Sequence, residues 1–249
     1  MPANDTASGL RPGLARLSFS LPTGQVEAEI RLPPGSVRLK DLLPLLQSLD
    51  DAIVNAAASA CVRQGHRITC VRGCGACCHL LISIAEAEAW HLRAVLDNMP
   101  HKRRSAILQR FEEAWARLAA AGLLTLLETL PLQPDATVAT AGAEYARLRV
   151  ACPFLEDGLC AIYAERPMRC REHLVVSPSE ECWAMSPGTI DSVEVAGRLS
   201  RALMACDGDT DRQGGWVPLI LAPRWAAEHT DCSRPRPAAD IVREVLGKV

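Results

Sequence analysis

Thr69-Cys70-Val71-Arg72-Gly73-Cys74-Gly75-Ala76-Cys77-Cys78-His79 is the stretch that organises the chain, because it places four cysteines within nine residues. Thiols at this density either bind a metal or oxidise. In a helix, with a rise of about 1.5 Å per residue, the first and last sulfurs would lie about 12 Å apart, too far for one ion with bonds of about 2.3 Å. The stretch is therefore expected to form a tight loop around a metal, running into a short helical turn.

Two glycines and one pair of adjacent cysteines refine this expectation. Gly73 and Gly75 supply the backbone freedom that a tight loop needs, and such a loop can point amide groups at the sulfurs. Cys77 and Cys78 are neighbours, and neighbouring side chains diverge in most backbone conformations. One of the two is therefore expected to serve a second metal or to bridge two metals.

A second region carries the remaining candidate ligands, Cys152, Cys160, Cys170 and Cys182. Asp157-Gly158 is a turn signal, so a small hairpin or loop is expected to bring Cys152 and Cys160 to one side. Pro167 ends the turn that precedes Cys170. Three arginines surround this cysteine: Arg166, Arg169 and Arg171. Their positive charge is expected to lower thiol pKa values and to offset the negative charge of several thiolates. The second region is thus expected to be the other half of the metal site.

Composition limits the role of these sulfurs. The chain has 249 residues with 49% hydrophobic content, enough for a sizeable core without disulfides. It shows neither a secretory signal nor an apolar run long enough to span a bilayer, which predicts a cytoplasmic protein without membrane partners. In that reducing compartment an odd number of cysteines, 11, favours metal ligation, redox chemistry or burial as small hydrophobic residues over disulfides. The net charge of -2 argues against a nucleic-acid partner.

The hydrophobic pattern predicts a mainly α fold with a small N-terminal β-hairpin and a cysteine-rich metal-binding domain. Residues 1–35 are expected to form a tail, up to residue 15, and a hairpin around Pro22-Thr23-Gly24; residues 36–249 are expected to form the helical domain. Ser83 and Glu86 fit a capping box at the start of a helix. This helix is expected to run through Ala87 and Leu96 and to end at Met99-Pro100. Further helices are predicted over residues 36–65, 101–121, 138–148, 191–204 and 238–246.

The cysteine blocks resemble the CxxCxxCC, or YkgJ-like, family of zinc- or iron-chelating proteins. The resemblance covers residues 66–183 and rests on four motifs: Cys70 to Cys78; Cys152-Pro-Phe-Leu with Gly158-Leu-Cys-Ala-Ile-Tyr163; Glu165-Arg-Pro-Met-Arg-Cys-Arg171; and Ser177-Pro-Ser-Glu-Glu-Cys182. One departure stands out. Three residues separate Cys70 from Cys74, and Val71 stands where the family's shorter spacing would have a cysteine.

The predicted ligands are therefore Cys70, Cys74, Cys77, Cys78, Cys152, Cys160, Cys170 and Cys182, with His79 and His173 as candidate nitrogen ligands or supporting residues. Cys61, Cys206 and Cys232 are left out. The expected cofactor is zinc or iron, the latter in mononuclear, polynuclear or iron-sulfur form. The number of thiolates allows two tetrahedral sites, one polynuclear centre, or one four-ligand site with spare cysteines.

Three functions remain open at this point, because the sequence lacks phosphate-loop, dinucleotide-binding and nucleophile-elbow motifs. The first is a metal-binding protein without its own reaction. The second is an iron-dependent or iron-sulfur enzyme that modifies a protein or peptide, since some relatives resemble flagellin lysine methylases. The third is an interaction module whose metal shapes a docking surface for a protein partner.

Overall fold

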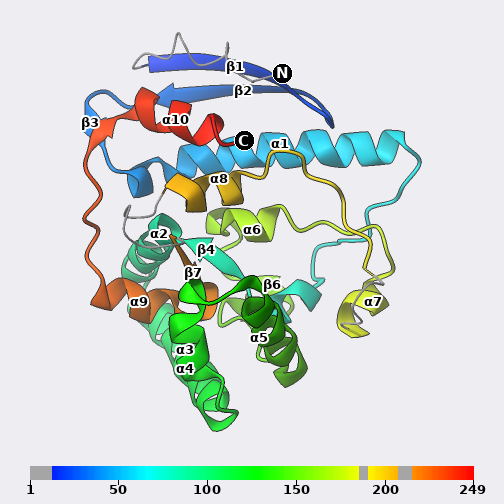
Figure 1. Cartoon of the computed structure of the whole chain (residues 1–249), viewed down its shortest axis with the longest axis vertical. Helices are drawn as coiled ribbons and strands as arrows, with labels where there is room; N and C mark the ends of the chain where they lie inside the picture. Colours follow the sequence, from blue (N-terminus) through cyan, green and yellow to red (C-terminus); the bar gives the residue numbers. More distant parts are fainter. Residues whose placement is uncertain (1–12, 185–189, 207–214) are drawn as a thin grey trace.

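The computed structural model describes residues 13–184, 190–206 and 215–249 (Figure 1). The strands are β1 (Gly13–Leu21), β2 (Gly24–Leu32), β3 (Ser36–Val37), β4 (Ser83–Ala85), β5 (Leu155–Glu156), β6 (Leu159–Cys160), β7 (Trp216–Pro218) and β8 (Arg236–Pro237). The helices are α1 (Leu43–Arg63), α2 (Glu86–Asp97), α3 (His101–Ala120), α4 (Leu124–Thr129), α5 (Asp135–Leu148), α6 (Met168–Arg171), α7 (Ser179–Ala184), α8 (Leu199–Cys206), α9 (Ala222–Glu228) and α10 (Ala238–Leu246). Short 3₁₀ turns connect several of them, and the fold is mainly helical, as predicted.

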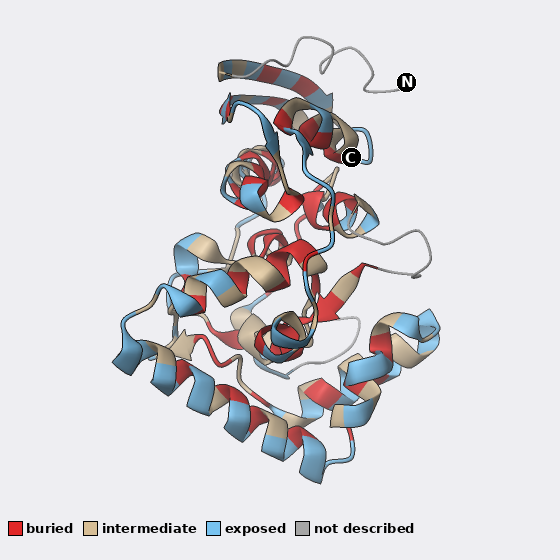
Figure 2. Cartoon of the chain, turned by 90° about the vertical axis from the view of Figure 1, so that its left-hand side faces the viewer, coloured by how far each residue is buried: buried red, intermediate tan, exposed pale blue. Residues whose placement is uncertain are grey.

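The N-terminal hairpin is confirmed. β1 and β2 pair antiparallel, with Phe19 opposite Val26 across the turn. Alternate residues of both strands are buried, and Figure 2 shows this alternation along the two strands. The buried face packs on α1, where Leu46 and Ile53 are fully buried. β1 begins at Gly13, so residues 13–15 are strand and not tail as expected; residues 1–12 lie outside the described part.

Two hydrophobic clusters form the core. The first joins the hairpin, α1, α8 and α10 at one end of the molecule, and the second joins α2, α3, α4, α5 and α9 at the other (Figure 1). Phe111 of α3 and Phe154 meet edge to face in the second cluster, with ring centroids 5.4 Å apart. α6 lies between the two ends (Figure 1), and its Met168 belongs to the first cluster whereas Cys170 packs against the second.

Two predictions about local structure are wrong. Residues 83–85 form β4, paired with β7, and the carboxylate of Glu88 rather than Glu86 accepts a hydrogen bond from the Ala85 amide at 2.9 Å. The helix predicted over residues 191–204 begins only at Leu199. The preceding segment instead pairs with the backbone after α6, where the Val193 amide donates to the Leu174 carbonyl at 2.8 Å. Backbone pairing across the fold has overridden local propensity there.

None of the helices in the described ranges combines the length and the apolar composition that crossing a bilayer requires.

Candidate metal centre

The first cysteine stretch forms a loop and not a regular helix, as its spacing predicts. The Cys74 amide donates to the Val71 carbonyl at 3.0 Å, and the Cys78 amide donates to the Gly75 carbonyl at 3.0 Å. Gly73 takes a φ of 92°, which a residue with a side chain rarely adopts. Ala76–His79 is a single 3₁₀ turn. The cysteines of this first stretch therefore project from a tight turn that lies against the second region.

The second region contains the predicted small hairpin. β5 and β6 pair antiparallel around a turn in which Asp157 and Gly158 have φ values of 49° and 77°. After Pro167 the chain enters α6, and the Cys170 amide donates to the Pro167 carbonyl at 3.0 Å. The turn and the proline therefore set the positions of Cys160 and Cys170.

The two regions contact each other through backbone. The Cys152 amide donates to the Cys78 carbonyl at 2.7 Å. A Cβ on Gly75 would lie 3.2 Å from the side chain of Leu155, and a Cβ on Gly158 would lie 3.2 Å from the Gly73 carbonyl oxygen. Gly75 thus allows close packing against β5, and its φ of −96° is ordinary. This direct packing joins the two cysteine regions, as the sequence predicts.

Gly158→Ala is expected to lower the free energy of unfolding by about 1–2 kcal/mol, because it combines a left-handed φ with a close contact to the Gly73 carbonyl. The matched control is Gly142→Ala in α5, where a Cβ would meet nothing within 4 Å. That change is expected to raise stability by about 0.5–1 kcal/mol, because it favours helix over the unfolded chain. Urea titration of both variants checks the pair, and equal effects would contradict the described contact.

Arg171 anchors the loop that connects Cys160 to Cys170. Its Nε donates to the Arg166 carbonyl at 2.8 Å, its Nη2 donates to the Ala164 carbonyl, and its Nη1 contacts both Asp51 carboxylate oxygens at 2.9 and 2.7 Å. The side chain is almost fully buried, whereas that of Asp51 is half exposed. Arg171 therefore ties the loop to α1, a role that the sequence did not reveal for either residue.

Arg171→Gln is expected to lower the free energy of unfolding by about 2–3 kcal/mol, because the charged side chain loses several hydrogen bonds and two carbonyl groups lose their donor. Arg171→Lys keeps the charge but cannot bridge three acceptors, so it should recover only part of the loss. Chemical unfolding of the two variants tests this order. A lysine variant as stable as the original chain would show that charge alone matters.

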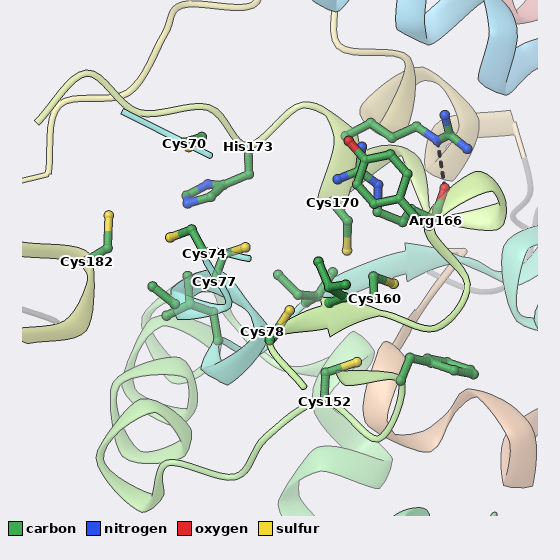
Figure 3. Close-up of a pocket in the computed structure, with 18 of the residues that line it drawn as sticks. Cys70, Cys74, Cys77, Cys78, Cys152, Cys160, Arg166, Cys170, His173 and Cys182 are labelled. Carbon is green, nitrogen blue, oxygen red and sulfur yellow. Dashed lines mark hydrogen bonds between the residues drawn. The ribbon is translucent and has the colours of Figure 1, made fainter. Parts of the chain in front are cut away.

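One cavity of about 550 Å³ collects the predicted ligands. All eight candidate cysteines line it, from the first loop, the segment before β5, strand β6, α6 and α7 (Figure 3). All eight are free thiols. Cys61, Cys206 and Cys232, which were left out of the predicted site, are not among the lining residues. Tyr145 and Ile220, which the sequence did not single out, form part of the cavity wall.

The thiols fall into two groups within this cavity. Figure 3 shows Cys70, Cys74, Cys77 and Cys182 on the left, and Cys78, Cys152, Cys160 and Cys170 on the right. Burial is the largest cause of the raised pKa of Cys182, and the thiols of its own group are the next largest. For Cys170 the next cause after burial is Cys152, which also belongs to its own group. Cys77 raises the pKa of cysteines in both groups. It lies between them.

Cys77 is also the most acidic of these thiols. A hydrogen bond from the Cys78 side chain and, to a smaller extent, the nearby Arg166 lower the pKa of Cys77 to about 7, although burial acts in the opposite direction. The same hydrogen bond raises the pKa of Cys78 far above its usual value. Burial raises the pKa of Cys152 to about 12 and that of Cys170 well above its usual range. Cys77 is therefore the thiolate that is present near neutral pH, whereas the buried thiols must lose protons when they bind a metal.

The two histidines differ in position. His173 lines the cavity, and burial, followed by repulsion from Arg169 and Arg198, lowers its pKa, so the ring is neutral as a metal ligand must be. His79 is not among the lining residues; its Nδ1 lies 3.2 Å from the Gly75 carbonyl and its ring lies 5.3 Å from that of Trp183. His79 thus links the first loop to α7.

The thiols of this cavity are suited to bind a soft or borderline metal. Among the described residues, however, their side chains are too far apart to coordinate one ion together. Within residues 13–184, 190–206 and 215–249, no three His, Cys, Asp or Glu side chains form a group that could hold a metal ion. Thiolates are nevertheless the ligands that zinc and iron-sulfur centres use in proteins. The donor set therefore fits the predicted metals, and binding requires the sulfurs to move inward.

Comparison with known proteins agrees with these cysteine motifs. Residues 69–187 match the model of the CxxCxxCC family, which is described as a putative zinc- or iron-chelating domain. No curated protein and no solved structure matches the chain. The matched segment starts one residue before Cys70 and includes all eight cysteines of the cavity. Residues 69–187 of this chain are therefore similar to the CxxCxxCC domain.

Proposed function

We propose that the chain binds zinc or iron through thiolates of both cysteine regions. The observation that carries this proposal is that all eight predicted ligands line one cavity although they come from segments more than 70 residues apart, Cys78 and Cys152. Chance burial of small apolar thiols would not gather them in this way. Cys77, with its lowered pKa, is the thiolate that first attracts the ion.

The division into two groups favours more than one metal. Four thiols lie in each group, and four is the number that a tetrahedral zinc or a [4Fe–4S] cluster takes. Cys77 and Cys78 belong to different groups although their side chains share a hydrogen bond, which supports a role for one of them as a ligand of a second metal or as a bridge between two. Two tetrahedral sites, or one polynuclear centre around Cys77, are therefore favoured over one four-ligand site with spare cysteines.

A second candidate function is an iron-dependent or iron-sulfur enzyme that acts on a protein or peptide. The observation in its favour is the size of the cavity, about 550 Å³, which exceeds what the metal alone would fill. Such an enzyme would need an open metal position beside this space. We place either function in the cytoplasm, since eight reduced thiols in one cavity are suited to a reducing compartment.

Anaerobic purification, followed by metal and acid-labile sulfide analysis and visible absorption spectroscopy, tests the proposal. Zinc or iron is expected in near-stoichiometric or higher amounts. Iron with sulfide and visible absorption would support a cluster and the second candidate, and zinc without absorption would support a structural or hydrolytic site. A chain that stays metal-free after incubation with zinc and with ferrous iron under anaerobic conditions would overturn the proposal.

A further inference from the structure

The three arginines around Cys170 have different roles. Arg171 is committed to Asp51 and to two carbonyl groups. Arg169 does not line the cavity, and burial and the charges of Arg198 and Arg201 lower its pKa. Arg166 lines the cavity. Of these three arginines, Arg166 alone therefore combines a position in the cavity wall with a guanidinium that has no acid partner among the described residues.

The Arg166 side chain is held in place without being neutralised. Its guanidinium carbon lies 3.9 Å from the centroid of the Tyr163 ring, a cation–π contact. Its Nε is buried and has no hydrogen-bond partner in the described part of the chain. A buried N–H without an acceptor is costly, so the site calls for an acceptor that the chain itself does not supply.

The rest of the cavity is suited to the body of an organic molecule. Its volume of about 550 Å³ lies within the range of about 300–1,000 Å³ that is usual for small-molecule sites. Apolar and aromatic side chains form much of its wall: Leu80, Leu81, Ile82, Tyr145, Phe154, Ile162, Leu219 and Ile220. Val71, Leu159 and Tyr163 also line it and are exposed, so the entrance too is apolar.

We infer that this cavity binds a small organic anion, with its apolar body against the wall and its carboxylate or similar oxyanion on the Arg166 guanidinium. A planar guanidinium matches such a group with two parallel hydrogen bonds, which a thiolate cannot provide. The Arg166–Tyr163 contact holds the guanidinium in advance of binding. The anion would lie beside the cysteines, whose Cys77 and Cys160 already feel the charge of Arg166.

The competing explanation is that Arg166 serves only as a counter-charge for metal-bound thiolates. The two explanations differ in what the arginine recognises. A counter-charge affects metal affinity alone, whereas an anion site distinguishes a charged ligand from a neutral one of the same shape.

Two fluorescent probes make this distinction with the protein as purified anaerobically. 8-Anilinonaphthalene-1-sulfonate is an aromatic anion, and N-phenyl-1-naphthylamine is its neutral counterpart. Both are expected to bind at about one molecule per chain. Arg166→Gln should weaken binding of the anionic dye roughly 10- to 100-fold and leave that of the neutral dye unchanged, since only a charged hydrogen bond is lost. Octanoate should displace the anionic dye from the original chain, and octanol should not.

Arg67→Gln is the matched control, because it makes the same change in net charge at an exposed position outside the cavity lining. It should leave both affinities unchanged. Metal content is measured for every sample, so loss of metal is seen separately from loss of dye binding. Equal weakening of both dyes by Arg166→Gln, no weakening of either, or loss of metal with unchanged discrimination between the dyes would overturn the inference.

Discussion

Cys77→Ser is expected to lower metal affinity more than any other single change of a cysteine in this chain. Cys77 lies between the two thiol groups and has a pKa of about 7, so its loss affects both groups and removes the most acidic thiol. Loss of a residue that merely supports a ligand costs roughly 10- to 100-fold in affinity, and loss of this thiolate should cost more. Competition with a chelator of known affinity, under anaerobic conditions, measures the effect.

The metal affinities of two further variants serve as a comparison for Cys77→Ser. Cys182→Ser removes a thiol from the edge of one group and should have a smaller effect, since the second group stays intact. Cys232→Ser changes an exposed thiol that does not line the cavity, and it should leave metal binding unchanged. If Cys77→Ser weakened binding no more than Cys232→Ser does, the central position of Cys77 would be wrong.

Asp50→Asn is expected to stabilise the protein, and increasingly so as pH rises. Asp50 is fully buried in α1, and neither of its carboxylate oxygens has a hydrogen-bond partner in the described residues. Burial, followed by the charges of Glu172 and Glu88, raises its pKa to about 9, although Arg171 acts in the opposite direction. The native state therefore keeps a proton on Asp50 at neutral pH.

The sign of this pH effect follows from the difference in the Asp50 pKa between the unfolded and the native chain. The unfolded chain releases the Asp50 proton near its ordinary pKa of 3.8, whereas the native chain holds it up to about pH 9. Between these values the native state binds more protons, so stability falls as pH rises. Asparagine cannot ionise and resembles the protonated acid. The advantage of Asp50→Asn should thus grow by roughly 3–4 kcal/mol between about pH 5.5 and about pH 8.5, at about 1.36 kcal/mol per pH unit.

Urea unfolding at several pH values measures this advantage. Asp191→Asn changes an exposed acid and serves as the control, with little expected effect at any pH. A constant difference between Asp50→Asn and the original chain across this range would contradict a protonated Asp50. Lower stability of the variant at high pH would contradict it more strongly, since it would mean that the native state uses the carboxylate.

Local sequence signals predicted the parts of the site that depend on turns and breaks. The spacing of Cys70 to Cys78 excluded a regular helix, and the loop with its 3₁₀ turn confirms this. Asp157-Gly158 predicted the β5–β6 turn, because few residues tolerate a positive φ. The amphipathic pattern of residues 101–121 predicted α3 to within one residue at its end.

Features that depend on contacts across the fold were not predictable in this way. Residues 191–198 have a helical pattern, but they pair with the backbone near Leu174 and Val175 instead. The sequence did not single out Tyr145 or Ile220, and only the packing of α5 and the segment after β7 brings them to the cavity wall. The burial of Asp50 beside two other acids has no local signal either, because it depends on how α1, α2 and α6 meet.

X-ray absorption spectroscopy at the metal edge of the anaerobically purified protein tests the central claim most directly, because it reports the atoms bound to the metal. We expect a first shell dominated by sulfur at about 2.3 Å in the original chain. In Cys77→Ser we expect the loss of metal, and not the appearance of a nitrogen- or oxygen-rich shell. A first shell composed mainly of nitrogen and oxygen in the original chain would contradict ligation by the cysteines of this cavity.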